Sequence, residues 1–217
     1  MYRQFSSDFT VYAFSRKTVL REGHTTRDMA RDQKEAMELL GLHKAHVFGV
    51  SMGGMIAQYL AIDRPDLVNK LVLAVTLSKN NSTVETVIND WIHMTEQADW
   101  KSLVNDMAVK MYSDAYIKKY KMMMPLLTAV QKPKDVKRFC TLAKACLTCS
   151  TYEELDQINC PVLVIGGEKD KIVTGQASKE IAEKLGCEIY MYEDLGHAAY
   201  EEAEDFNKKV YEFIKRK

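Results

Sequence analysis

The sequence has no excess of charge of either sign and no long apolar run. Thirty basic and thirty acidic side chains give a formal net charge of +0, so nothing in the charge points to a nucleic-acid or membrane-surface partner. No segment approaches the ~18 apolar residues of a membrane span, and no signal-peptide pattern opens the chain. We expect a cytoplasmic protein with no nucleic-acid and no membrane partner.

Cysteine is scarce, and its five residues are odd in number and fit no disulfide framework, which indicates free thiols in a reducing compartment. Cys146 and Cys149 have C-x-x-C spacing, but a redox or zinc role needs a strand-loop-helix setting or a second Cys/His pair, and neither is visible. Most of the histidines have no metal-type spacing either and read as structural or solvated: His24, His43, His46 and His93. We expect no metal and no cofactor.

Short β-branched runs alternate with segments of helical periodicity. Strands are expected at 9–14, 45–50, 70–75, 161–165 and 187–192, and helices at 26–40, 52–62, 177–185 and 203–215. Thr26 is the expected N-cap of the first helix. Apolar strands separated by helices predict an α/β fold with a doubly wound, mostly parallel sheet covered on both faces.

The alternation stops between residues 80 and 151, where methionines, aromatics and helical periods replace strand runs. The chain then returns to strand and helix, so we expect a helical cap inserted into a core formed by residues 1–79 and 152–217. Pro125 and Pro133 are expected to divide the insertion into separate helices.

One serine is crowded by glycine directly after a β-branched strand. Gly49-Val-Ser51-Met-Gly53 fits the G-x-S-x-G pattern between a strand and a helix. A tight turn there strains the serine backbone, and we expect that Cβ atoms at Gly49 and Gly53 would collide with neighbouring chain. Such a turn lifts the hydroxyl off the sheet and leaves the Met52 N–H, at the helix start, free to bind an oxyanion.

An acid and a histidine follow in the order that a serine-acid-histidine triad needs on a parallel α/β sheet. Asp170 comes shortly after one apolar strand and His197 after the next, and the carboxyl ends of parallel strands gather at one edge. In this reading His197 takes the Ser51 proton and Asp170 orients the imidazole. Glu168 is a weaker candidate for the acid, and Glu193 and Asp194 lie too near the histidine in sequence.

These motifs, together with the runs Gly49 to Gln58, Arg64 to Leu73 and Cys160 to Asp170, resemble the α/β-hydrolase superfamily, near its esterase and enol-lactonase-like members. The resemblance covers the chain from about Phe9 onward. It implies that residues 80–151 close over the active site and shape the substrate pocket.

The chain departs from this family at its beginning. Relatives begin with two or three further strands and a His-Gly loop that supplies the second oxyanion N–H, and no segment here matches them. The missing third strand would leave an empty slot between Phe9 to Phe14 and Ala45 to Val50. Three outcomes stay open: the first strand moves into the slot, a second subunit fills it, or the chain is a fragment of a longer protein. The new edge favours a homodimer. Backbone near Ser15 or Arg16 could supply the missing N–H.

The leading hypothesis is a serine hydrolase that cleaves a small carboxylic ester, thioester or lactone through a Ser51 acyl-enzyme, slowly if one oxyanion donor is missing. Its partner is then a small-molecule acyl substrate. Two alternatives stay open. One is a catalytically impaired, ligand-binding or dimerising relative, and the other is a peptidase or carbon-carbon bond hydrolase of the same fold.

Overall fold

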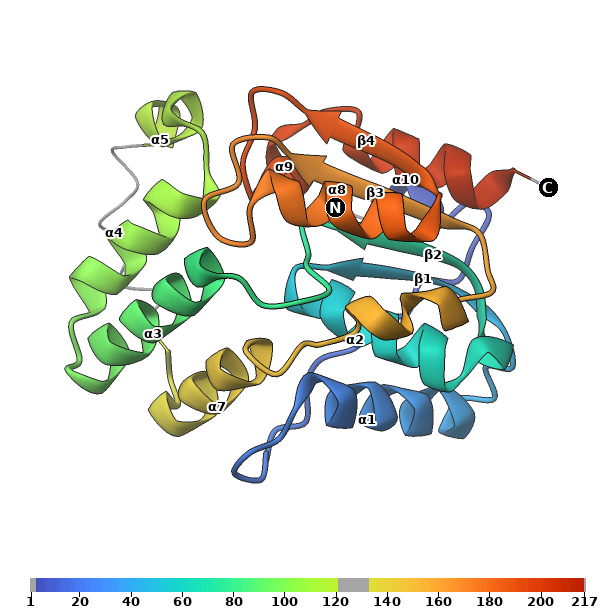
Figure 1. Cartoon of the computed structure of the whole chain (residues 1–217), viewed down its shortest axis with the longest axis horizontal. Helices are drawn as coiled ribbons and strands as arrows, with labels where there is room; N and C mark the ends of the chain where they lie inside the picture. The colour runs from blue at the N-terminus through green and yellow to red at the C-terminus, as the bar shows by residue number, and fades with distance from the viewer. Residues whose placement is uncertain (1–2, 121–132, 217) are drawn as a thin grey trace.

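The computed structural model describes residues 3–120 and 133–216 of the chain. Its sheet has four strands: β1 Ala45–Val50, β2 Val68–Ala74, β3 Val162–Gly167 and β4 Glu188–Tyr192. The helices around it are η1 Arg3–Phe5, α1 Thr26–Leu39, α2 Met52–Asp63, η2 Pro65–Leu67, η4 Tyr152–Gln157, α8 Gly175–Leu185, α9 Ala199–Glu202 and α10 Phe206–Lys215. These elements follow one another along the chain as alternating strands and helices (Figure 1).

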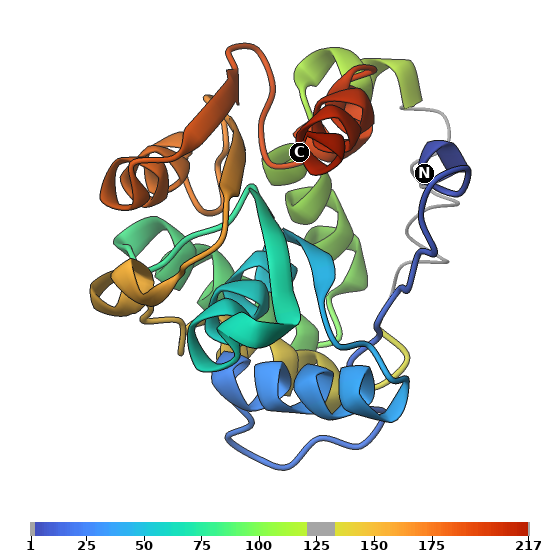
Figure 2. The same ribbon diagram turned by 90° about the vertical axis from the view of Figure 1, so that its right-hand side faces the viewer.

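The sheet is parallel throughout, in the order β1-β2-β3-β4. The two central strands, β2 and β3, are largely buried because helices cover both faces of the sheet. One core cluster joins α1, α2 and α8 to one face, through residues such as Ile56, Leu60 and Ile181. A second cluster joins η1 and α10 to the opposite face, through Phe206 and Phe213 (Figure 2). The predicted α/β fold with a doubly wound parallel sheet is confirmed.

The described part of residues 80–151 is helical. It contains α3 Ser82–Glu96, α4 Trp100–Met111, α5 Asp114–Tyr120 and α7 Val136–Cys146, which lie together beyond one end of the sheet (Figure 1). The chain leaves and returns at one place, because Lys79 and Ser150 form an antiparallel bridge. We call this segment the helical insertion. The expected break at Pro125 lies outside the described residues, whereas Pro133 lies three residues before the start of α7.

The predicted strand at Phe9 to Phe14 is wrong. Residues 9–14 are assigned to no helix or strand and run beside β1 without joining the sheet (Figure 2). A cavity of about 650 Å³ separates this segment from β1. Of the three outcomes expected for the slot, movement of this segment into it is therefore not what the structure shows. An apolar, β-branched run becomes a strand only where a neighbouring strand is within hydrogen-bond reach.

The N-cap of α1 is one residue earlier than predicted. The Thr25 side chain accepts a hydrogen bond from the Asp28 N–H, and the Asp28 carboxylate accepts one from the Thr25 N–H, which completes a capping box. Thr26 instead is fully buried and donates its N–H to the Thr148 hydroxyl in the loop after α7. Thr26 thus ties α1 to the end of the helical insertion.

Among the described residues, no helix is both long and apolar enough to cross a membrane.

Candidate active site

Ser51 occupies the tight turn between β1 and α2. Its backbone has φ 52° and ψ −120°, a conformation that costs a non-glycine residue of the order of 1–3 kcal/mol. Two bonds hold the turn: the Ser51 N–H donates to the Ala74 carbonyl of β2, and the Thr76 hydroxyl donates to the Ser51 carbonyl. The strain predicted for this serine is therefore present in the structure.

The glycines around this turn differ in what they make room for. A Cβ on Gly49 would lie 2.7 Å from the Gly53 carbonyl carbon and closer still to its oxygen. A Cβ on Gly54 would lie 2.6 Å from Thr76. At Gly53 the prediction of a collision is wrong, because the nearest atom to a Cβ there is Nη2 of Arg16, at an ordinary 3.6 Å. The turn therefore requires glycine at 49 and 54, and tolerates a Cβ at 53.

The structure brings the three predicted triad residues together. His197 Nε2 lies 2.9 Å from Ser51 Oγ, and His197 Nδ1 lies 2.8 Å from Asp170 Oδ2. Both His197 and Asp170 are buried, with 3% and 7% of their surface exposed, whereas Ser51 is partly exposed. The hydroxyl, imidazole and carboxylate form one hydrogen-bonded chain. Only its serine end is partly accessible to solvent.

The Asp170 carboxylate is held in place by backbone. Its Oδ1 accepts hydrogen bonds from the N–H groups of Ile172 and Val173, at 2.8 and 3.0 Å, while Oδ2 faces the histidine. Charge-assisted bonds of this kind fix a carboxylate and satisfy it in a buried setting. Asp170 is therefore oriented independently of the imidazole that it contacts.

The loop that carries Asp170 and the loop that carries His197 also approach each other closely through their backbones. A Cβ on Gly167 would lie 2.5 Å from the Leu195 carbonyl oxygen, and the Lys169 N–H donates to that same oxygen at 3.0 Å. Sequence reasoning did not single out Gly167 as a site residue. The adjacent glycines at the end of β3 were the available signal, since glycine in a strand often marks a close backbone approach.

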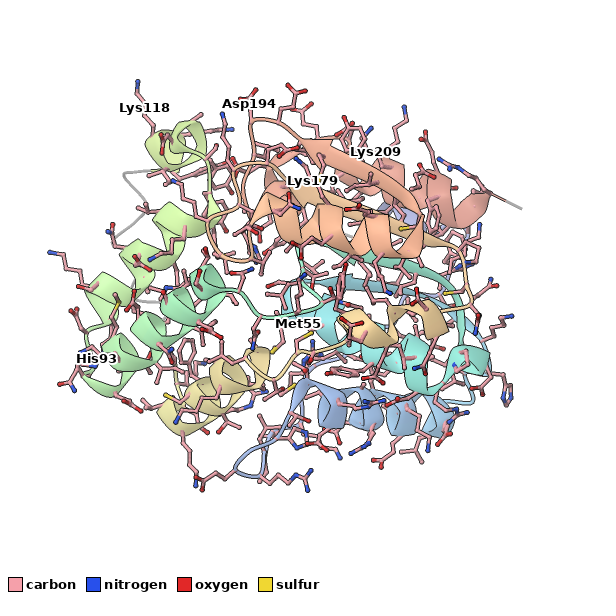
Figure 3. The ribbon with its side chains drawn as sticks, in the orientation of Figure 1. Met55, His93, Lys118, Lys179, Asp194 and Lys209 are labelled. Carbon is pink, nitrogen blue, oxygen red and sulfur yellow. The ribbon has the colours of Figure 1, made fainter. Side chains whose placement is uncertain are left out.

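The alternative acids lie elsewhere. Glu168 pairs with Lys179 of α8, and Asp194 pairs with Lys169 with 89% of its side chain exposed. Figure 3 labels Asp194 on the outer surface, in the loop after β4. No hydrogen bond between any of these carboxylates and His197 occurs in the described part of the chain, so Asp170 is the acid that the geometry selects.

The Met52 N–H is the candidate oxyanion donor beside the serine. Met52 is the first residue of α2, so its N–H has no partner within the helix and lies at the positive end of the helix dipole. Beside the same turn, the Arg16 guanidinium approaches Gly53, and burial lowers its pKa. The sequence suggested backbone near Ser15 or Arg16 as a second donor. What the structure places next to the turn is the Arg16 side chain.

The helical insertion contacts the histidine loop directly. The Ala198 N–H, next to His197, donates to the Met111 carbonyl at the end of α4 at 2.8 Å. Two further bonds join the start of α5 to α9: Tyr112 donates to Glu201, and the Ser113 N–H donates to Glu202. The loop that carries His197 is therefore hydrogen-bonded directly to the helical insertion.

The other histidines and the cysteines lie apart from this site. His24 pairs with Asp32 at 2.9 Å, and Figure 3 places His93 on the outer side of the helical insertion. Burial raises the pKa of the Cys146 and Cys149 thiols to about 12 in each case, the opposite of what a reactive cysteine needs. In the described residues, no three His, Cys, Asp or Glu side chains are grouped to hold a metal ion.

Comparison with known proteins agrees with this geometry. The model of the alpha/beta hydrolase fold family matches residues 3–99. Among solved structures, MGS-M2, an alpha/beta hydrolase from a Medee basin deep-sea metagenome library, superposes with a TM-score of 0.86 at 22% identity, over 91% of this chain and 74% of that one. The enol-lactonase of Burkholderia xenovorans LB400 gives 0.82 at 20% identity, over 93% and 78%. The chain therefore has the α/β-hydrolase fold.

Curated relatives are more distant in sequence. A 2-hydroxy-6-oxononadienedioate/2-hydroxy-6-oxononatrienedioate hydrolase of Pseudomonas is 24% identical over 194 residues, which cover 86% of this chain and 69% of that protein. A protein assigned as the carbamate hydrolase RutD of Caulobacter sp. (strain K31) is 27% identical over 171 residues, covering 76% and 63%. The chain thus spans less than the full length of the curated relatives it matches, about two thirds in these two cases.

Proposed function

We propose that the chain is a serine hydrolase that cleaves a small carboxylic ester, thioester or lactone. The observation that carries the proposal is the continuous bond path from Ser51 Oγ through His197 to Asp170, with 2.9 and 2.8 Å steps. A serine hydroxyl is a weak nucleophile by itself, and a histidine oriented by a buried carboxylate activates it. The names of the two curated relatives described above, both hydrolases, and of the enol-lactonase support this class.

In the proposed mechanism, His197 Nε2 takes the Ser51 proton as the Ser51 oxygen attacks the carbonyl carbon. The negative charge on the carbonyl oxygen is stabilised by the Met52 N–H. The C–O bond to the leaving group then breaks, and His197 returns the proton to the departing alcohol. Water attacks the acyl-enzyme by the same route and releases the carboxylic acid. Asp170 stabilises the charged imidazole at both stages.

The proposed reaction is slow. Losing one of two oxyanion donors typically costs about 2.7–4 kcal/mol of barrier, a factor of roughly 10² to 10³ in rate. In this mechanism the Met52 backbone N–H is one oxyanion donor. The candidate for the second donor is the Arg16 guanidinium, which lies beside Gly53. The Arg16→Gln variant tests whether the guanidinium stabilises the oxyanion. If it does, removing this charged donor lowers kcat with little change in KM.

The first experiment compares wild-type protein with Ser51→Ala on short-chain p-nitrophenyl esters, with fluorophosphonate labelling followed by mass spectrometry as an independent readout. We expect ester hydrolysis and labelling at Ser51 in the wild type and neither in the variant. Equal hydrolysis by the two proteins, with no label on Ser51, would defeat the proposal. Labelling of Ser51 without ester turnover would favour the alternative of an impaired, ligand-binding relative.

A substrate panel then separates the reaction classes. It contains a lactone, a thioester, a carbamate, a peptide and a 2-hydroxy-6-oxo-dienoate, the last two representing peptidase and carbon-carbon bond cleavage. The proposal expects the highest Ser51-dependent kcat/KM on the oxygen ester or lactone. Faster turnover of the dienoate would transfer the assignment to the carbon-carbon class, with the same three side chains. We propose residues 80–151 as the cap that sets this choice.

A further inference from the structure

The side chain of Asn81 joins the start of the helical insertion to the loop that carries Asp170. In Figure 1 the strand arrows point towards the insertion, so the loops that follow the strands lie at its end of the sheet. Asn81 directly precedes α3. Its Nδ2 donates a hydrogen bond to the Val173 carbonyl at 3.0 Å. We call residues 168–174, between β3 and α8, the acid loop.

The Asn81 amide makes two bonds that need opposite groups. Its Oδ1 accepts the Val84 N–H at 2.9 Å, which caps α3, while its Nδ2 donates to Val173. A backbone N–H only donates and a carbonyl only accepts, so these two partners fix the orientation of the amide. Aspartate or serine would cap a helix as well as asparagine does. Capping alone therefore does not call for an amide at this position, whereas the bond to Val173 does.

Val173 connects this bond to the Asp170 carboxylate. Its N–H donates to Asp170 Oδ1 at 3.0 Å, beside the bond from the Ile172 N–H to the same oxygen. The helical insertion thus holds the carbonyl of Val173, and the carboxylate holds its N–H. Val173 is 1% exposed, which limits competition by water for either bond.

The peptide that Asn81 holds is followed by a strained residue. Thr174 has φ 76° and ψ 145°, and a β-branched residue rarely adopts a positive φ. Such strain persists only where the surroundings hold it in place. Rotation of the peptide between Val173 and Thr174 would relieve the strain, but it would turn the Val173 carbonyl away from Asn81. The same rotation changes ψ of Val173, the residue whose N–H binds Asp170.

Apolar packing accompanies the polar contact. Ile172 and Val173 of the acid loop belong to one buried cluster with Val84, Val87 and Ile88 of α3. This packing sets the distance between the loop and the helix but does not select a direction for the Val173 peptide, because the hydrophobic effect is non-directional. The hydrogen bond from Asn81 supplies that direction.

We propose that Asn81 is a positioning residue for the Asp170 carboxylate and acts through Val173. Together with the bond from the Ala198 N–H to the Met111 carbonyl, it makes the helical insertion a support for both Asp170 and His197. The inference rests on the proposed function, because the alignment of Asp170 affects a rate only where His197 activates Ser51. The start of the insertion then influences the chemical step as well as the choice of substrate.

The variant Asn81→Asp separates the two bonds of this side chain. Aspartate keeps the acceptor that caps α3 but has no N–H to donate to Val173. On a p-nitrophenyl ester, we expect kcat to fall about tenfold with little change in KM. By hydrogen exchange followed with NMR, the Val173 amide should exchange about tenfold faster than in the wild type. The Val84 amide, which is still capped, should exchange at the wild-type rate.

Two further variants control for charge and for capping. Asn81→Ser is neutral and keeps a capping oxygen, but its shorter side chain does not reach Val173. It should match Asn81→Asp in kcat and in exchange at Val173. Asp99 is exposed and caps α4 by accepting the Ser102 N–H. Asp99→Ala therefore removes a cap from the same insertion, and it should leave both kcat and the Val173 exchange unchanged.

Two results would overturn the inference. One is wild-type kcat and wild-type exchange at Val173 in both Asn81 variants, because the bond to Val173 then supports nothing. The other is an equal loss of kcat in Asp99→Ala, because general loosening of the insertion then accounts for the effect. A wild type without Ser51-dependent hydrolysis defeats the proposed function instead. In that case the exchange at Val173 still decides whether Asn81 holds the acid loop.

Discussion

Replacing Gly49 by Ala tests whether the serine turn depends on close backbone approach. The added Cβ would lie 2.7 Å from both the Gly53 carbonyl carbon and the Gly54 Cα, against an ordinary 3.4–4 Å. Because these atoms are backbone, no side-chain rotation can relieve the clash. The strained Ser51 backbone, at φ 52°, has to shift instead. The variant should therefore lose both stability and the alignment of the hydroxyl.

The size of the effect follows from the cost of overpacking, typically about 1–3 kcal/mol and occasionally more. A clash with backbone alone belongs at the upper end, so we expect a loss of ~3 kcal/mol. For a chain of this size that lowers Tm by roughly 6–12 °C. Gly53→Ala is the matched control. Its Cβ meets only Nη2 of Arg16 at 3.6 Å, and alanine raises the helix propensity of α2 by up to ~1 kcal/mol.

The assay is urea unfolding together with the rate of fluorophosphonate labelling at Ser51. Gly49→Ala should unfold at lower urea and label much more slowly, while Gly53→Ala should stay within about 1 kcal/mol of the wild type. The reasoning fails if both alanine variants behave alike, because a Cβ would then be tolerated equally well at positions 49 and 53.

Four further predictions concern the Asp170 carboxylate, the N-cap of the first helix, the Asp28 carboxylate and the buried thiols. Asp170→Asn keeps the backbone bonds to Oδ1 but mis-sets the imidazole tautomer, so Ser51 labelling should slow by about 10³ to 10⁴; a slowing below tenfold would speak against it. Thr25→Ala breaks the capping box of α1 and should cost about 0.5–2 kcal/mol in urea unfolding, with exposed Thr18→Ala unchanged. Burial would raise the pKa of Asp28, but hydrogen bonds from Thr25 and Arg21 lower it overall. Its contribution to stability is therefore present above pH ~4 and is lost as the pH falls towards the folded pKa, so the deficit of Asp28→Asn should shrink in acid unfolding curves. Cys146 and Cys149, with pKa values raised to about 12 by burial, should resist iodoacetamide at pH 8 until urea unfolds the chain; fast labelling of the native protein would contradict this.

The serine turn and the triad could be placed from sequence because each is specified locally. A strand, a G-x-S-x-G turn and a helix follow one another without interruption, and β1 Ala45–Val50 has the predicted bounds. Asp170 and His197 each come shortly after an apolar strand, and parallel strands bring those ends together. Chain order and strand direction were sufficient to predict which side chains meet.

Residues 9–14 could not be predicted in the same way, because their conformation depends on a neighbouring strand. The pattern of Phe9 to Phe14 indicates a strand, but a strand exists only through its pairing, and β1 lies across a cavity. The approach of the Arg16 side chain to Gly53 could not be predicted for the same reason, because it depends on the path of the whole segment. The N-cap differed by one residue since Thr25 and Thr26 carry the same hydroxyl, and only tertiary contact with Thr148 separates them.

The hydrogen bond from the Ala198 N–H to the Met111 carbonyl has a consequence for protein engineering. Exchanging the helical insertion for that of another protein with this fold also exchanges the hydrogen-bond acceptor that holds the loop beside His197. A chimaera whose junction lies after Ser113 would retain this acceptor and the α9 contacts, and one spliced before α4 would discard them. Under the proposed function, the choice of splice point thus decides whether a new substrate pocket is obtained with the His197 loop still held in place or without that support.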